Sequence, residues 1–215
     1  MMNILITGFE PFDGEPVNPA LEAARKLHGL QIGGHSITAL ELPCVFGASI
    51  DMLERHIAEL RPGIVLCIGQ AGGRTSVDLE RVAINVDDAR IPDNAGNQPI
   101  DEAIVAGGPA AYFSGLPIKA IVQALLAAGI PASVSQTAGT YVCNHIFYGL
   151  SHLLATRYPE TRGGFVHIPY LPEQAARHAG AASMSLEIIV AGLKLVLETT
   201  VAVTRDVKLQ GGQTH

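Results

Sequence analysis

The segment GIVLCIGQAGG at residues 63–73 constrains the fold more than any other part of the chain. Its run IVLCIG is apolar at successive positions and is shorter than a typical helix, which is characteristic of a strand buried on both faces of a sheet. We interpret NILITGF at 3–9 and GGFVHIPYLP at 163–172 as strands too. A strand that is apolar on both faces must be covered from both sides, so the sequence predicts helices flanking a mostly parallel sheet.

Segments with helical spacing alternate with the strand-like segments. Helices are expected at 18–28, 46–60, 117–128, 142–158 and 172–200, and further strands at 35–43, 77–86 and 131–136. Residues 89–117 are rich in proline, glycine, asparagine and aspartate, and we expect them to be irregular. The alternation predicts one α/β domain over residues 1–208, with a twisted, mostly parallel sheet and flanking helices. Residues 209–215 are expected to form a frayed tail.

Composition narrows the class of partner and the compartment. Of the 215 residues, 48% are hydrophobic and the formal net charge is −6, which argues against nucleic acid or an anionic membrane as a partner. The first residues lack the basic region of a signal peptide, and charged residues interrupt the apolar C-terminal segment, so no membrane span is expected. Three cysteines without a C-x-x-C motif favour a reducing compartment, and we expect a cytoplasmic protein.

Cys143 is the first candidate for chemistry. It follows a glycine-broken turn in AGTYVCNHIF and opens an apolar run with helical spacing. A thiol at a helix N-terminus lies in positive potential, which favours the reactive thiolate. The alternative is a small buried hydrophobe, the commoner fate of a free cysteine. Cys67, inside IVLCIG, is expected to be structural, and Cys44 is expected to pack or to line a pocket.

A cysteine nucleophile needs a base and usually a group that orients the base. His167 lies at the end of a strand that Pro169 stops, so its ring can emerge at the sheet edge; the alternative is a satisfied core histidine. Glu80 interrupts an apolar strand pattern, and its alternative role is an ion pair with Arg81 or Arg90. No cluster has zinc-type spacing, so no metal is expected. GQAGGR lacks the order of glycines found in nucleotide-binding loops.

Six blocks taken together resemble those of the pyroglutamyl peptidases (pyrrolidone carboxyl peptidases), and they occur in the same order. They are TGFEPF at 7–12, GQAGGR at 69–74, ERVAIN at 80–85, RIPDNAGNQP at 90–99, GTYVCN at 139–144 and FVHIPY at 165–170. The resemblance extends from residue 4 to about residue 200. It implies an α/β/α globule, a cysteine peptidase that removes an N-terminal pyroglutamyl residue from peptides, no cofactor, and commonly a homotetramer.

The resemblance also assigns residues. It implies that Cys143 is the nucleophile, His167 the base, Glu80 the residue that orients the imidazole, and Arg90 a group that holds the oxyanion. The implied substrate pocket consists of Phe9, Phe12, Asn18, Gln70, Ile91, Tyr141 and Val142. Two positions depart from the family pattern: Tyr141 stands where relatives often have phenylalanine, and Cys44 where some have threonine.

The residues alone leave two other classes of function open. One is a non-catalytic module that binds a metabolite through its glycine loop. The other is an amidase with a Glu-Lys-Cys site, which needs a lysine near the thiol; the chain has only Lys26, Lys119, Lys194 and Lys208, all outside the motif blocks.

Overall fold

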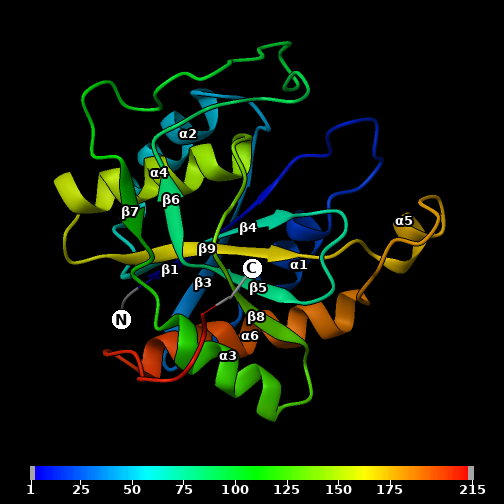
Figure 1. Cartoon of the computed structure of the whole chain (residues 1–215). Helices are drawn as coiled ribbons and strands as arrows, with labels where there is room; N and C mark the ends of the chain where they lie inside the picture. The colour runs from blue at the N-terminus through cyan, green and yellow to red at the C-terminus, as the bar shows by residue number, and fades with distance from the viewer. Residues whose placement is uncertain (1–2, 213–215) are drawn as a thin grey trace.

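The computed structural model describes residues 3–212 and consists of a twisted sheet between two layers of helices (Figure 1). In sheet order, the strands are β2 (Gln31–Ile32), β3 (His35–Leu42), β1 (Asn3–Phe9), β4 (Ile64–Gln70), β9 (Arg162–Ile168), β5 (Val77–Glu80) and β8 (Ala132–Ser135). Neighbouring strands are parallel except in the pairs β2–β3 and β5–β9. The predicted α/β fold with a mostly parallel sheet is confirmed.

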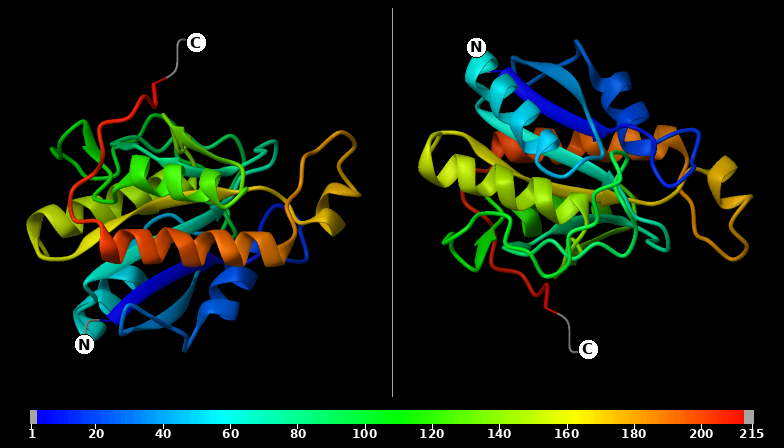
Figure 2. Two further views of the ribbon diagram at one scale, coloured as in Figure 1. Left: turned by 90° about the horizontal axis from the view of Figure 1, so that it is seen from below. Right: turned by 90° about the horizontal axis from the view of Figure 1, so that it is seen from above.

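Helices cover both faces of the sheet (Figure 2). One face carries α1 (Pro19–Leu27), α3 (Ile118–Ala127) and α6 (Leu186–Ala202), and the other carries α2 (Ala48–Leu60) and α4 (Val142–Thr156). A small two-stranded antiparallel sheet of β6 (Val82–Ile84) and β7 (Ala111–Phe113) packs beside α4. A four-residue helix, α5 (Pro172–Ala175), lies in a segment that projects from the body of the molecule (Figure 1).

The central strands alternate between the two layers, as a doubly covered sheet requires. On β1, Leu5 points toward α2 and α4, whereas its neighbours Ile4 and Ile6 point toward the opposite helices. On β4, Cys67 points toward α2 and α4, and Leu66 points toward α1, α3 and α6. The apolar pattern read from the sequence therefore fills two separate cores.

The expected helix over 172–200 is wrong, because the chain forms α5, leaves the helical conformation, and starts α6 only at Leu186. Gly180 adopts a φ of 78°, a left-handed conformation that interrupts a helix. Ser185 then caps α6 by accepting a hydrogen bond from the backbone N–H of Ile188. The segment between the two helices is consequently free to form one wall of the site.

The expected strand over 77–86 divides at Arg81. Val77–Glu80 pairs in the main sheet, and Val82–Ile84 leaves it to pair with β7. Strand β7 itself lies inside the stretch 89–117 that was expected to be irregular, and β2 was not expected. These short strands depend on tertiary pairing, which a single segment does not reveal.

Of the expected tail, residues 209–212 are described and residues 213–215 lie outside the described part. The carbonyl of Leu209 accepts a hydrogen bond of 2.6 Å from Lys119 Nζ, and the carbonyl of Gly211 accepts one of 2.6 Å from Arg81. Within residues 3–212, no helix is long and apolar enough to cross a membrane.

Candidate active site

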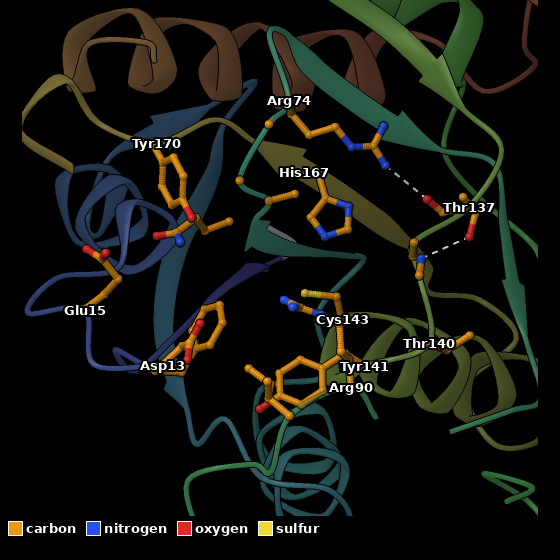
Figure 3. Close-up of a pocket in the computed structure, with 18 of the residues that line it drawn as sticks. Asp13, Glu15, Arg74, Arg90, Thr137, Thr140, Tyr141, Cys143, His167 and Tyr170 are labelled. Carbon is orange, nitrogen blue, oxygen red and sulfur yellow. Dashed lines mark hydrogen bonds between the residues drawn. The ribbon is translucent and has the colours of Figure 1, made fainter. Parts of the chain in front are cut away.

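A cavity of about 660 Å³ opens where β4 and β9 end, between the loops that follow them and the turn that precedes α4 (Figure 3). This is the carboxyl edge of the parallel strands, where open α/β sheets bind ligands. The cavity wall includes seven of the residues expected from the sequence: Phe12, Gln70, Arg90, Ile91, Tyr141, Cys143 and His167. Glu80 lies directly behind His167.

Three residues expected in the substrate pocket do not lie on its wall. Phe9 and Val142 are almost fully buried in the core between the sheet and α4. Asn18 is buried as the N-cap of α1, where its side chain accepts a hydrogen bond from the backbone N–H of Ala20. Phe9 and Val142 pack behind the cavity wall and Asn18 caps α1, so none of the three forms part of the wall itself.

Cys143 is the second residue of α4 and points into the cavity. Tyr141, the N-cap of α4, makes no side-chain capping bond, so backbone N–H groups of the first turn remain available beside the thiol. Gly69 of β4 makes room for the sulfur: a Cβ atom there would lie 2.9 Å from Cys143 Sγ and 2.7 Å from the Phe165 ring. The thiol therefore rests against the bare backbone of the sheet.

Burial raises the pKa of the Cys143 thiol, and nearby Cys44, Glu80 and Cys67 act in the same direction. The thiol thus needs a neighbour that takes its proton if it is to act as a nucleophile near neutral pH. Figure 3 shows Cys143 and His167 projecting into the same part of the cavity. Burial also raises the pKa of Cys44 and of Cys67 to about 12, so both remain thiols at neutral pH.

His167 is held by Glu80. The Nδ1 atom of His167 lies 2.7 Å from Glu80 Oε1, and both side chains are almost fully buried. Because a carboxylate can only accept at that distance, the proton resides on Nδ1 and leaves Nε2 available as a base. The Phe165 ring packs edge-on against the imidazole with centroids 4.9 Å apart. This arrangement fixes the tautomer and the orientation of the ring.

The cation beside Glu80 is Arg74, not Arg81 or Arg90. Arg74 lies 3.4 Å from Glu80 Oε1 and 2.9 Å from Asp78 Oδ2. Arg81 instead bonds the carbonyl of Gly211, and Arg90 lines the cavity. Sequence reasoning missed Arg74 because GQAGGR was examined for its glycines alone.

Arg90 is exposed, and within residues 3–212 no hydrogen bond or ion pair ties its guanidinium to the protein. Such a donor can turn toward a ligand in the cavity. Tyr141 is fixed instead: its hydroxyl donates to the carbonyl of Pro92 at 3.0 Å, and its ring packs on Phe46 and Phe12 with centroids 5.5 and 6.2 Å apart. The tyrosine therefore forms a rigid wall despite its departure from the family pattern.

Two polar residues after Cys143 anchor α4 to the rest of the protein. Asn144 is fully buried, and its side chain accepts from the backbone N–H of Ile84 at 3.0 Å and donates to the Ile84 carbonyl at 2.9 Å. His145 Nδ1 lies 2.8 Å from Asp87 Oδ2, and its Nε2 accepts from the backbone N–H of Gly47 at 2.8 Å. These bonds hold the start of α4 in register with the cavity.

A hydrogen-bonded chain orients Gln70. The Oε1 atom of Gln174 accepts from the backbone N–H of Leu171 at 3.1 Å, so its Nε2 must donate, and it does so to Gln70 Oε1 at 2.9 Å. The amide N–H groups of Gln70 are thereby left to face the cavity. Gln174 was not expected, because it was placed within the long helix that the structure breaks.

The same segment closes one side of the cavity. Glu15 accepts hydrogen bonds from Arg177 and His178, both at 2.7 Å, and His178 stacks on Tyr170 with centroids 4.9 Å apart. The His178 bond is the main cause that lowers the pKa of Glu15, with Gln174 and Arg177 adding to it and burial opposing it. This wall joins the loop after β1 to the segment after β9.

No group of histidine, cysteine, aspartate or glutamate side chains suited to a metal ion exists within residues 3–212. No lysine lines the cavity. The second observation removes the residue that a Glu-Lys-Cys amidase would need.

Comparisons with known proteins agree with the geometry. The family model described as pyroglutamyl peptidase matches residues 2–203. The chain is 63% identical, over the full length of both proteins, to the pyrrolidone-carboxylate peptidase of Cupriavidus pinatubonensis. The crystal structure of pyroglutamyl peptidase I from Bacillus amyloliquefaciens matches with a TM-score of 0.95 and 49% identity, covering 97% of this chain and 99% of that chain. A variant of pyrrolidone carboxyl peptidase from Pyrococcus furiosus matches with a TM-score of 0.91 and 42% identity, covering 94% and 99%.

Proposed function

Because this chain belongs to the pyroglutamyl peptidase family and removes N-terminal pyroglutamate from peptides, we propose that Cys143, His167 and Glu80 form its catalytic triad. One observation carries the assignment: a buried imidazole, bonded through Nδ1 to a carboxylate at 2.7 Å, shares a cavity with a thiol at a helix N-terminus. In this arrangement His167 is the base and Glu80 orients it.

The reaction is an acyl transfer in two steps. Cys143 Sγ gives its proton to His167 Nε2 and attacks the carbonyl carbon that joins pyroglutamate to the next residue. The tetrahedral intermediate collapses, His167 passes the proton to the leaving amine, and a thioacyl-enzyme remains. Water, deprotonated by His167, then attacks the thioester and releases pyroglutamate and the free thiol.

The negative oxygen of each tetrahedral intermediate needs fixed donors. The backbone N–H of Cys143 lies in the uncapped first turn of α4, where the helix dipole adds positive potential. The unpaired guanidinium of Arg90 supplies a second, charged donor from the cavity wall. We assign both to the oxyanion site.

The substrate end is a neutral lactam ring with one ring N–H and one ring carbonyl. Phe12, Ile91 and Tyr141 supply apolar wall for its faces. The amide N–H groups of Gln70, oriented by Gln174, are donors suited to the ring carbonyl. A free N-terminal glutamine, glutamate or proline carries an ammonium group whose desolvation this apolar wall does not offset.

Hydrolysis of coumarin amides tests the assignment. The wild type is expected to cleave the pyroglutamyl amide at least about a hundredfold better, in kcat/KM, than the glutaminyl, glutamyl and prolyl amides. Cys143→Ala should abolish turnover, whereas Cys67→Ala, which alters a buried thiol of the same layer, should retain it. Iodoacetamide should modify one thiol of the folded protein and remove activity in proportion.

Activity that survives in Cys143→Ala, or equal rates on the prolyl and pyroglutamyl amides, would contradict the proposed site. A non-catalytic binding module would show no turnover to lose.

We also propose that the protein is cytoplasmic and forms a homotetramer. Three free thiols suit a reducing compartment. The tetramer rests on the family resemblance, and light scattering at micromolar concentration tests it: a strictly monomeric mass would contradict it.

A further inference from the structure

Arg74 ends the GQAGGR loop between β4 and β5 and sits at the edge of the cavity. Its guanidinium donates to four groups: Asp78 Oδ2 at 2.9 Å, Glu80 Oε1 at 3.4 Å, Ser135 Oγ at 3.2 Å and the Thr137 carbonyl at 3.1 Å. The last of these bonds is visible in Figure 3. The side chain thus links the loop after β4 to both β5 and β8.

Strand β5 presents two carboxylates to this one cation. Asp78 and Glu80 are two residues apart, so they point to the same face of the sheet, toward α4. Their side chains are 3% and 0% exposed, whereas that of Arg74 is 30% exposed. Two buried anions so close to each other are costly unless a cation and hydrogen bonds compensate them.

The two carboxylates differ in what else supports them. Asp78 Oδ1 accepts from the hydroxyls of Ser76 at 2.6 Å and Ser133 at 2.7 Å. Glu80 Oε2 is buried and has no donor within the described residues, and Oε1 is bonded only by His167 and Arg74. Loss of Arg74 therefore affects Glu80 more than Asp78.

The charged and titratable groups that face Glu80 come from three elements and a loop. They are Asp78 on its own strand, His167 on β9, Cys143 on α4 and Arg74 in the loop after β4. Asp78 and a Cys143 thiolate both disfavour a second negative charge at Glu80. Arg74 is the permanent cation of this set, because arginine stays protonated at any pH at which the protein folds.

We propose that Arg74 is a positioning residue of the hydrolytic reaction, which holds Glu80 ionised and aimed at His167. The inference rests on the proposed triad. An ionised Glu80 accepts the Nδ1 proton, keeps Nε2 toward Cys143 and stabilises the imidazolium that forms when the thiol is deprotonated. A protonated Glu80 would itself carry a hydrogen and could not play that part.

The competing explanation is that Arg74 only neutralises Asp78 and so maintains the fold. A double variant separates the two. In Arg74→Met combined with Asp78→Asn, the buried charge that needed compensation is gone, but Glu80 still lacks its cation. A structural role predicts that the double variant recovers the wild-type pH profile in full. A positioning role predicts only partial recovery, because Asp78→Asn removes one charge that opposes an ionised Glu80 but does not restore the donor 3.4 Å from Glu80 Oε1.

The experiment measures the rate of Cys143 alkylation by iodoacetamide between pH 4 and 9, together with kcat and KM for the pyroglutamyl-coumarin amide. In Arg74→Met, the acid limb of the alkylation profile should move up by about one pH unit or more, since an opposite charge at this range shifts a carboxyl by that amount. On that limb kcat should fall by about tenfold, because one unit is a factor of ten, with KM little changed.

Arg74→Lys, which keeps the charge but not the forked geometry, should restore part of kcat, and the double variant should keep part of the displacement of the limb. Arg81→Met is the matched control, since Arg81 adjoins the same strand but bonds the carbonyl of Gly211. Its profile should match the wild type. If Arg74→Met does not fold, the lysine and double variants carry the same comparison.

Three outcomes would overturn the inference: a wild-type limb in the double variant, a wild-type profile in Arg74→Met, or a raised KM with unchanged kcat, which would make Arg74 a substrate contact. Failure of the triad itself has a separate signature. It would appear in the wild type, as alkylation of Cys143 that leaves hydrolysis intact.

Discussion

The two faces of the sheet are built from different kinds of side chain. The core under α1, α3 and α6 contains only aliphatic residues and one methionine, with no aromatic ring and no cysteine. The core under α2 and α4 holds the buried aromatic rings and both fully buried cysteines, and Cys143 packs against it. The first layer holds the sheet together. The second layer also carries the thiol of the proposed triad, and its rings, thiols and paired polar groups can shape and polarise a cavity where methyl groups cannot.

The contrast is sharpest on β9, where adjacent residues serve different layers. Val166 points into the aliphatic core and His167 toward the cavity. His167→Gln, which still offers Glu80 a donor, should lose about 10⁴-fold in kcat while the protein stays folded, because no base remains. Val166→Ala should cost about 2 kcal/mol of unfolding free energy and leave kcat unchanged. Kinetics and urea unfolding of both variants test whether the two sides of β9 serve stability and activity separately. A loss of kcat above tenfold in Val166→Ala would contradict that separation.

Two glycines provide a second matched pair. A methyl group at Gly69 would lie 2.9 Å from Cys143 Sγ, so Gly69→Ala should displace the thiol and lower kcat/KM by about a hundredfold or more. Gly192 lies inside α6, and a methyl there would meet its neighbours at 3.6 Å, an ordinary contact distance. Gly192→Ala should therefore raise stability by about 0.5–1 kcal/mol without altering kcat/KM. Thermal unfolding and coumarin hydrolysis measure both effects; a fully active Gly69→Ala enzyme would show that the thiol does not rest on β4.

The smallest expected effect concerns the wall of the cavity that joins the loop after β1 to the segment after β9. The pKa of Glu15 is lowered in the folded protein, chiefly by His178, so its contribution to stability is present above the usual range of glutamate and is lost as pH falls through its folded value. Glu15→Gln should be less stable than the wild type by a few tenths of a kcal/mol to about 1 kcal/mol at pH 6, since the pair is partly exposed. Unfolding titrations at pH 6 and pH 3 should show this difference decrease at the lower pH; a difference that grew on acidification would contradict the prediction.

The sequence predicted strands such as Ile64–Gln70 well, because a run that is apolar on both faces has few other uses. The break between α5 and α6 was missed, since alanine-rich residues favour a helix, whereas Gly180 takes a left-handed φ of 78° in a turn that the Ala181 N–H closes by donating to the His178 carbonyl. For the site, position in the chain suggested Cys143 and His167 as candidates, and the family resemblance assigned their roles. The partnership of Arg74 with Glu80 was missed, because GQAGGR was examined for its glycines alone and the pair depends on how the loop after β4 folds back onto β5.

The position of β9 has a consequence for the order in which the protein can be built. This strand lies between β4 and β5, so it joins one half of the sheet, β2-β3-β1-β4, to the other half, β5-β8. On the ribosome, where synthesis runs from the N-terminus, the sheet cannot become continuous until residue 168 has emerged. The strand that closes the gap also carries His167. A growing chain therefore lacks His167, the proposed base of the site, until this strand has been made.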